Sequence, residues 1–245
     1  MVNENRLPHA LLFTGVDGSG NLPTAIAFAQ YLFCTNRQAN DSCGACPSCM
    51  KTSKLVHPDL HFVFPIAKSK DVKRSNDVIA EFREAFLETP YLTLNDWFDS
   101  LGAENKQPII PVEESGHIIR ELSYTSYEGL YKMMVIWQPE KMNIEAANKL
   151  LKVLEEPPEQ TLFILVCNNP DSLLATIISR VQQIPFTRLQ ENEITDALMK
   201  KFGVNRDVAA QAAFLCDGNF NEAIKQLTQN DDQLFFLEHF QSFMR

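Results

Sequence analysis

The sequence Gly15-Val16-Asp17-Gly18-Ser19-Gly20-Asn21-Leu22 decides the fold that we expect for this chain. An apolar run typical of a strand, residues 11–13, comes before it, and a helix-like run, residues 25–33, follows it. Strand, glycine turn and helix in this order indicate a phosphate-binding loop of the form G-x-x-x-x-G-K-[ST], in which the lysine contacts the β- and γ-phosphates and the hydroxyl binds magnesium. Asn21 replaces the lysine and Leu22 replaces the hydroxyl. The loop therefore has the spacing of a nucleotide site without its charged chemistry, and a glycine turn that only imitates the motif is the alternative.

Length and composition indicate a globular protein. The chain has 245 residues, of which 45% are hydrophobic, enough for one large or two modest domains. It has no apolar run of the roughly 18 residues that a membrane span needs, and residues 1–9 lack the pattern of a secretory signal, so we expect a cytoplasmic protein with no membrane partner. The net charge of −9 argues against a surface that binds nucleic acid over its whole extent.

Four of the six cysteines lie close together with the spacing C-x8-C-x2-C-x2-C: Cys34, Cys43, Cys46 and Cys49. In a reducing cytosol this spacing favours metal binding over disulfides. Four thiolates complete a tetrahedral shell, so the sequence predicts a structural zinc ion with no open position for catalysis. Free or oxidised thiols are the alternative.

Other potential ligands are less well placed. His57 and His61 follow the cysteines and could compete for the metal, but Pro58 prevents a regular helix from aligning them. Cys167 and Cys216 each stand alone in an apolar run, which is typical of a small buried side chain.

Residues 66–108 follow no clear pattern. A basic cluster, Lys68 to Arg74, precedes a helix-like stretch over residues 78–87 and then the aromatic pair Trp97 and Phe98. Acidic residues alternate with the basic ones, which favours a solvated loop and a surface helix over a nucleic-acid patch.

The periodicity becomes regular from residue 112 to residue 186. Continuous apolar runs at residues 132–137 and 161–167 predict buried strands, and residues 112–122 and 145–156 predict helices. Such strands separated by helices indicate a parallel sheet covered on both faces. Ligands of these sheets bind at the carboxyl ends of the strands, where the glycine loop would lie.

A second nucleotide signature is expected at the end of the strand at residues 132–137. Active enzymes of this architecture place an aspartate there to hold magnesium, beside a glutamate that orients water. This chain has Trp137-Gln138-Pro139-Glu140 instead. Glu140 lies beyond the strand end, where it either precedes a helix in solvent or substitutes for the missing acid.

Several stretches together resemble the bacterial DNA polymerase III clamp-loader subunits, which are AAA+ proteins. They are the segment from Asn148 to Pro158 (NKLLKVLEEPP), Ile178-Ser179-Arg180, the four cysteines after the first helix, and residues 9–13. The resemblance covers most of residues 6–186 and implies an α/β fold: a P-loop-type parallel sheet domain with an inserted zinc module, followed by a small helical lid.

The resemblance also implies a domain organisation. We expect a nucleotide-binding-like domain over residues 1–186, with the zinc module at 34–49 and an insertion at about 66–108. A three-helix lid follows at 187–230, with predicted helices at 191–202, 206–216 and 220–229. Residues 231–245 are apolar and end abruptly, which indicates the start of a helical collar domain that a truncated chain would lack.

Departures from the family pattern indicate the role. The motor subunits keep the loop lysine and threonine, an acidic pair and a lid arginine. The matching positions here are Asn21, Leu22, Trp137, Gln138 and Asn221. The chain therefore resembles the delta-prime class, whose members do not hydrolyse ATP, and we expect no bound ATP and no intrinsic ATPase activity.

Ser179-Arg180 is retained. In the family this arginine completes the ATP site of a neighbouring subunit, so the resemblance implies that Arg180 acts in trans, supported by Ser179. The implied partners are gamma/tau-type and delta-type subunits, with the sliding clamp and primed DNA reached through the complex, within a DNA-directed DNA polymerase holoenzyme. An arginine on a loop before a strand is otherwise an ordinary surface residue.

Two other functions stay open at this point. One is an active AAA+ ATPase with a divergent loop, such as a gamma/tau-like clamp-loader subunit or a helicase loader. The other is a zinc-bearing DNA-binding module on an ATPase scaffold. Only the non-hydrolysing subunit accounts for both the lost nucleotide residues and the retained arginine.

Overall fold

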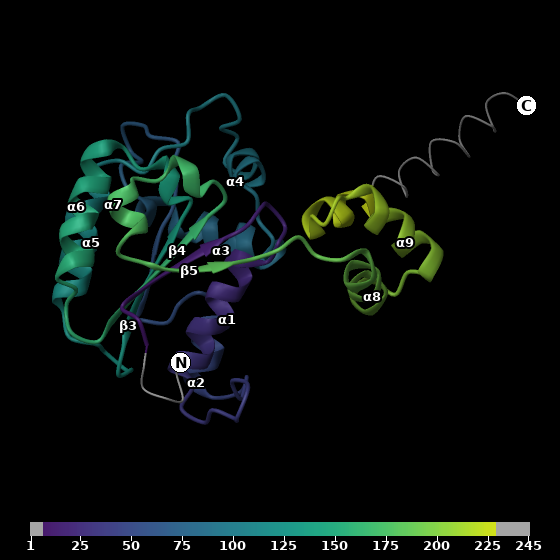
Figure 1. Cartoon of the computed structure of the whole chain (residues 1–245), viewed down its shortest axis with the longest axis horizontal. Coiled ribbons are helices and arrows are strands. Elements are labelled where there is room, and N and C mark those ends of the chain that lie inside the picture. The colour runs from purple at the N-terminus through teal and green to yellow at the C-terminus, as the bar shows by residue number, and fades with distance from the viewer. Residues whose placement is uncertain (1–6, 229–245) are drawn as a thin grey trace, which may run out of the picture.

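A five-stranded parallel sheet forms the centre of the larger part of the chain, and the helices α8 (Glu191–Phe202) and α9 (Arg206–Leu215) lie to one side of that part (Figure 1). The computed structural model describes residues 7–228. The strand order is β2-β3-β4-β1-β5, and every pairing is parallel. The strands are β1 (Ala10–Thr14), β2 (Leu60–Val63), β3 (Lys132–Trp137), β4 (Thr161–Cys167) and β5 (Gln182–Pro185).

The three central strands agree with the sequence pattern. All residues of β3 and β4 are buried, as expected for strands covered on both faces. The edge strands β2 and β5 were not predicted. β5 has the sequence QQIP and three of its four residues are exposed, so it has no apolar signature, and β2 is only four residues long. Short edge strands are held by pairing with a neighbour, which the local sequence does not reveal.

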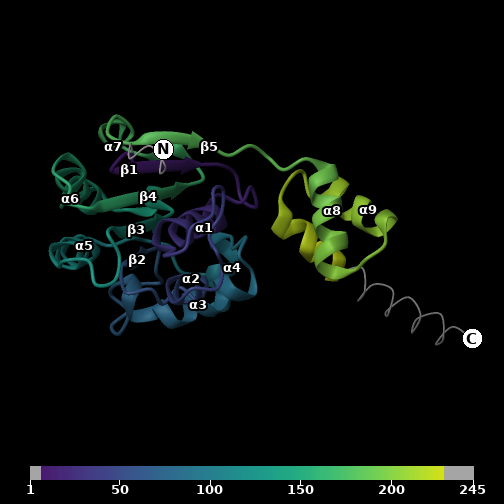
Figure 2. The same cartoon turned by 90° about the horizontal axis from the view of Figure 1, so that it is seen from below.

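Helices cover both faces of the sheet, and Figure 2 shows them as separate layers. The helices α1, α3 and α4 and strand residues such as Phe13 and Val135 contribute to one apolar core. The helices α5 to α7 and the opposite strand residues form a second core. The helices of the two layers are α1 (Asn21–Phe33), α2 (Pro47–Ser53), α3 (Ile79–Glu88), α4 (Leu94–Ser100), α5 (Glu113–Ser123), α6 (Ile144–Glu155) and α7 (Ala175–Ile178). Short 3-10 turns, η2 (Ser75–Val78), η3 (Pro139–Lys141) and η4 (Pro170–Ser172), connect them.

The segment at residues 66–108 is an integral part of the first core. The Trp97 side chain is fully buried, and its Nε1 donates a hydrogen bond to the Pro65 carbonyl oxygen over 2.8 Å. The Trp97 ring meets those of Phe64 and Phe82 edge-on, with centroids 5.4 and 5.5 Å apart. The predicted helix is present as α3, and the basic residues from Lys68 to Arg74 lie on an exposed to half-buried loop.

Three helices follow β5 and pack around a third apolar core. They are α8 (Glu191–Phe202), α9 (Arg206–Leu215) and a helix over residues 220–228. α8 ends at Gly203, whose φ of +68° is the left-handed conformation that a helix C-terminus favours. The expectation for residues 231–245 lies outside the described part of the chain.

Candidate functional site

The glycine loop joins the carboxyl end of β1 to the first turn of α1. Gly18 and Gly20 have φ values of +75° and +87°, which explains the need for glycine at both positions. Ser19 is 4% exposed, and its hydroxyl oxygen has no hydrogen-bond partner within residues 7–228. The two glycines therefore make a tight turn between β1 and α1.

Asn21, at the position of the absent lysine, is bonded inward. Its Nδ2 donates to the Gly15 carbonyl oxygen and to Oδ1 of Asn168, both over 3.3 Å, and its Oδ1 accepts from the backbone N–H of Leu22 over 2.8 Å. Leu22 is 2% exposed and belongs to the core, so it offers no metal ligand. The two substituted positions thus hold the loop to its own scaffold.

A pocket of about 280 Å³ lies beside the loop at the ends of β3 and β4, and its lining includes Asp17, Gln138 and Glu140. Oε1 of Glu140 accepts the backbone N–H groups of Asn168 and Asn169 over 2.9 and 3.1 Å. Asp17 accepts a hydrogen bond from the Asn168 side chain, and burial raises the pKa of the Asp17 carboxyl group. Glu140 therefore holds a loop of its own chain, and the pocket is lined by two carboxyl groups together with the cationic Lys141.

The third lid helix, residues 220–228, packs against the glycine loop. The N–H of Phe220 donates to the Gly18 carbonyl oxygen over 3.4 Å. A Cβ atom added at Gly18 would lie 2.0 Å from Oδ1 of Asn219, so the lid approaches the loop as closely as glycine allows. The ring of Tyr91, from the 66–108 segment, lies 3.5 Å from the Cβ position of Gly20 and packs on the Phe220 ring with centroids 4.6 Å apart.

Asp96 on α4 connects the 66–108 segment to the third lid helix. Its carboxylate accepts from Asn221 Nδ2 over 2.5 Å and pairs with Lys225 Nζ over 2.6 Å. Burial opposes the charged form, but hydrogen bonds from Lys225 and Thr93 outweigh it, and the pKa of Asp96 lies below its ordinary value. Asn221 on the third lid helix therefore contacts α4.

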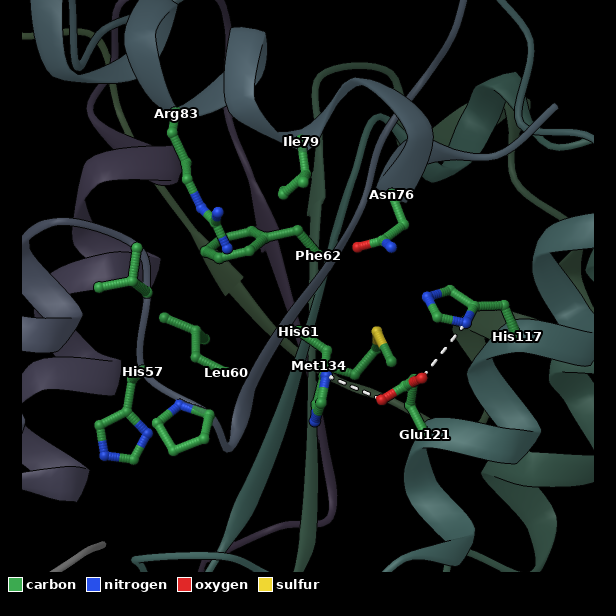
Figure 3. Close-up of a pocket in the computed structure, with 12 residues that line it drawn as sticks. His57, Leu60, His61, Phe62, Asn76, Ile79, Arg83, His117, Glu121 and Met134 are labelled. Atoms are coloured by element: carbon green, nitrogen blue, oxygen red, sulfur yellow. Dashed lines mark ion pairs between the residues drawn. The ribbon is translucent and has the colours of Figure 1, made fainter. Parts of the chain in front are cut away.

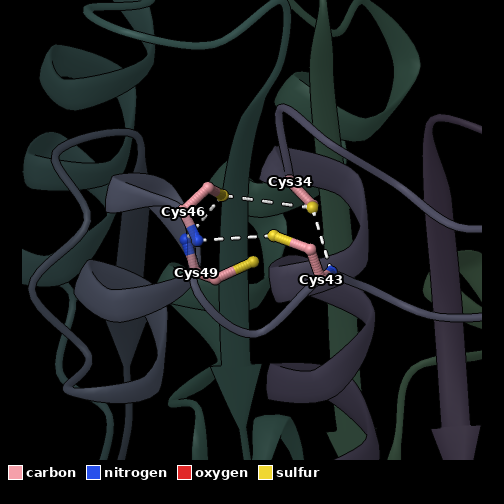
Figure 4. A group of neighbouring side chains, drawn as sticks. All are labelled: Cys34, Cys43, Cys46 and Cys49. Atoms are coloured by element: carbon pink, nitrogen blue, oxygen red, sulfur yellow. Dashed lines mark hydrogen bonds between the residues drawn. The ribbon is translucent and has the colours of Figure 1, made fainter.

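Cys34, Cys43, Cys46 and Cys49 converge at one point beside α2 (Figure 4). Their sulfur atoms all lie within 4.8 Å of one another, and no histidine belongs to this group in the described part of the chain. Backbone N–H groups donate to the sulfurs of Cys34 and Cys43 over 3.3 Å and of Cys46 over 3.5 Å. Four converging sulfurs with N–H donors fit a tetrahedral ion such as zinc.

Arg180 lies two residues after α7 and two residues before β5. Leu11 of β1 pairs with Gln182, so Arg180 lies at the amino end of the sheet, level with about residue 9. The glycine loop begins at Gly15, and at a rise of about 3.3 Å per residue the two lie roughly 20 Å apart. The Arg180 side chain is 34% exposed and forms an ion pair with Glu155 over 2.6 Å.

A further pocket, of about 300 Å³, lies along the edge strand β2 and contains His61, His117 and Glu121 (Figure 3). The Glu121 carboxylate lies 3.7 Å from Nδ1 of His61 and 3.5 Å from Nδ1 of His117. Burial lowers the pKa of both imidazoles and of His57, which also lines the pocket. His57 stacks on Phe33, with ring centroids 4.2 Å apart.

Sequence reasoning missed Tyr91, Asp96 and Asn219. Tyr91 and Asp96 come from a segment without a clear pattern, and their contacts join residues about 130 positions apart along the chain. The turn signal Asp217-Gly218, with φ values of +49° and +79°, and the helix predicted at 220–229 pointed to this part of the lid. No helix within residues 7–228 is long and apolar enough to cross a membrane.

Comparison with known proteins identifies the family. A family model described as "DNA polymerase III, delta subunit" matches residues 1–190. DNA polymerase III subunit delta′ of Bacillus subtilis is 32% identical over 234 residues, which is 94% of this chain. The chain belongs to the DNA polymerase III delta-prime family. This delta-prime family member spans 57% of the length of that relative.

Two other proteins relate the delta-prime chain to its wider group. DNA polymerase III subunit tau of Bacillus subtilis is 25% identical over 92% of this chain and 34% of its own length. A gamma-subunit-related protein of Thermotoga maritima has the same fold, with a TM-score of 0.50 and 19% identity over 92% of this chain and 54% of its own. The parallel sheet with its helices is thus a fold of clamp-loader type.

Proposed function

We propose that this chain is a clamp-loader subunit that does not hydrolyse ATP and that supplies Arg180 in trans to the ATP site of a neighbouring subunit. The observation that carries the proposal is the position of Arg180, half-exposed at the amino end of the sheet and roughly 20 Å from the glycine loop of its own chain. An arginine side chain cannot span that distance, so its phosphate target has to belong to another molecule. An arginine supplied to a phosphoryl-transfer site accelerates hydrolysis by about 10³ to 10⁵.

The state of the chain's own loop supports the proposal. The Asn21 side chain is neutral and bonded to Gly15 and Asn168, so it leaves no cation for a γ-phosphate. The Tyr91 ring and the third lid helix lie against Gly20 and Gly18, where a bound nucleotide would need space. ATP binding is therefore not part of the proposed function.

Zinc is the metal that we propose for the four cysteines. The donor set is four sulfurs, which zinc accepts in a closed structural site. The ion would hold residues 34–49 in place and take no part in a reaction. Elemental analysis of protein purified without chelator should give one zinc per chain, and less than about 0.2 zinc per chain in unoxidised protein would contradict this assignment.

The proposed organisation follows from the same assignment. Residues 1–186 are the AAA+ domain, 187–230 the lid and 231–245 the start of a collar. The proposed partners are gamma/tau-type and delta-type subunits in the cytoplasm, with the sliding clamp and primed DNA contacted through the assembled complex. Relatives named delta′ and tau support this choice of partners.

The test is reconstitution of a loader with wild-type, Arg180→Ala or Arg180→Lys subunit. The variants should fold and assemble normally, because Arg180 is on the surface. DNA-stimulated ATP hydrolysis should fall in part, since other subunits complete the other sites, and clamp placement on primed DNA should fall severely. Lysine should not rescue the activity, because it lacks the planar fork of N–H donors. Unchanged rates in an assembled complex would overturn the proposal.

The alternative is an active, gamma/tau-like ATPase with a divergent loop. The 25% identity to a tau subunit is the observation in its favour. Calorimetric titration of the isolated chain with magnesium-ATP decides between the two, because only the alternative predicts micromolar affinity.

A further inference from the structure

The guanidinium group of Arg180 is fixed by three acceptors of its own chain. Nη2 pairs with Oε1 of Glu155 over 2.6 Å. Nη1 donates to the Thr176 carbonyl oxygen over 2.8 Å and to the Ser179 hydroxyl oxygen over 3.3 Å. These contacts come from two places, the last residue of α6 and, on the other side, α7 with the residue that follows it. A side chain with several free torsions is thus held in one orientation.

The hydrogen-bond capacity of arginine shows that this arrangement leaves N–H groups of Arg180 available to bind a further ligand. A guanidinium group has five N–H donors, and the three acceptors use one donor each. Nε–H and one N–H of Nη2 have no partner among the described residues. Arg180 can therefore keep its contact with Glu155 while two N–H groups bind an oxygen of a phosphoryl group.

Glu155 is well placed to hold the Arg180 guanidinium group in one orientation. It is the last residue of α6, and that helix is anchored to the sheet by Leu150 and Leu154, each 1% exposed. Its own side chain is 48% exposed. An ion pair so exposed to water contributes little to folding, so stability does not explain the orientation of the pair.

We propose that Glu155 is a positioning residue that orients Arg180 toward a phosphoryl group held by the neighbouring subunit. The inference rests on the proposed function. Glu155 does not touch the nucleotide; it acts through Arg180. A shift of about 1 Å in a catalytic group can cost up to about 100-fold in rate, so the loss of a fixed orientation has a measurable effect.

Substitutions of Glu155 in a reconstituted loader test the role. Glu155→Ala and Glu155→Met both remove the acceptor, and Met keeps the length and helix propensity of the side chain. Both should lower the rate of clamp placement about 10-fold, with the KM for ATP unchanged because Arg180 still reaches the site. Glu155→Gln keeps an acceptor oxygen and should retain activity within about twofold. Glu156→Ala is the matched control, since Glu156 is the adjacent exposed residue and makes no contact with Arg180 in the described structure.

A double variant of Glu155 and Arg180 distinguishes positioning of Arg180 from an effect of Glu155 on the loader that does not involve Arg180. In an Arg180→Ala background, Glu155→Ala should cause no further loss, because the residue that it orients is gone. Equal rates for Glu155→Ala and wild type, with Arg180→Ala impaired, would overturn the inference and leave the proposed function standing. A full additional loss in the double variant, or a lower melting temperature with an unchanged rate, would also overturn it. If Arg180→Ala itself has no effect, both proposals fail.

Discussion

The two ends of the parallel sheet have opposite properties. At the carboxyl end, Asn21 of the glycine loop donates hydrogen bonds within its own chain, and Tyr91 and the lid occupy the adjoining space. At the amino end, Arg180 is half-exposed and keeps two N–H donors without partners among the described residues. Because the two sites lie roughly 20 Å apart, one can lose its chemistry without disturbing the other. On the proposed function, a subunit of this fold contributes to hydrolysis without a nucleotide site of its own.

The largest expected effect contrasts the two ends directly. Arg180→Ala should reduce clamp placement by a reconstituted loader at least about 100-fold, whereas Asn21→Ala should leave it unchanged. Asn21→Ala should lower the free energy of unfolding by about 1 kcal/mol, because its hydrogen bonds to Gly15 and Asn168 are lost. Clamp placement and urea unfolding measured on both variants test the contrast. A loading defect in Asn21→Ala equal to that of Arg180→Ala would contradict the difference between the two ends of the sheet.

The next effect concerns the carboxyl end of the sheet, where the lid packs against the glycine loop. Phe220 is 4% exposed and packs between the lid core and the Tyr91 ring. Phe220→Ala should destabilise the lid by about 3 kcal/mol or more, as for other large-to-small changes in a core. Hydrogen exchange of α8 and α9 should accelerate. Tyr91→Phe keeps the ring and serves as the control, and unchanged exchange in Phe220→Ala would show that the lid does not depend on this contact.

The amino end should be the more sensitive to acid. Burial holds the pKa of His57 below its ordinary 6.5, so as the pH falls the folded form takes up a proton less readily than the unfolded chain does. Its contribution to stability is present above pH 6.5 and is lost as the pH falls, at up to about 1.4 kcal/mol per pH unit. His57→Asn, which keeps an acceptor for the Asp59 N–H, should make stability fall less steeply between pH 6.5 and 5. Urea unfolding at several pH values tests this, and an identical slope in the variant would contradict it.

The last prediction is that restoring the two loop residues has no effect on nucleotide affinity. Restoring the loop with Asn21→Lys and Leu22→Thr should not give micromolar affinity for magnesium-ATP, because Tyr91 and the lid still occupy the space and no acid stands at Trp137 or Gln138. The same pair combined with Tyr91→Ala shows whether the ring alone is responsible. Tight binding by the first double variant would mean that only the two loop side chains had closed the site.

Much of the fold could be predicted from the sequence where the pattern is local. The strands β3 and β4 and the helix α8 begin and end at the predicted residues, because continuous apolar runs mark the strands and a capping glycine marks the end of the helix. The edge strand β5 and the helix α4 could not be predicted, since QQIP has no strand pattern and Trp97 is buried by distant partners.

The same distinction applies to the candidate sites. Spacing along the chain predicted the convergence of the four cysteines, which the structure places within 4.8 Å of one another, although the ion itself stays a prediction. The contacts of Tyr91 and Asp96 with the lid cross more than 120 residues and leave no mark in the local sequence. The role of Arg180 also stays a prediction, because its target lies outside the chain.

The position of β1 has a consequence for how the molecule folds. β1 lies between β4 and β5, and Ala10 pairs with Phe163, a partner about 150 residues later in the chain. Such a long loop has to close before the pairing yields any stabilisation, so we expect slow folding with a high contact order. On the ribosome, the glycine loop has to wait for both neighbours of its strand to be synthesised, whereas the cysteine cluster, within 16 residues, can form early. A fragment that ends before residue 161 would leave β1 with neither neighbour.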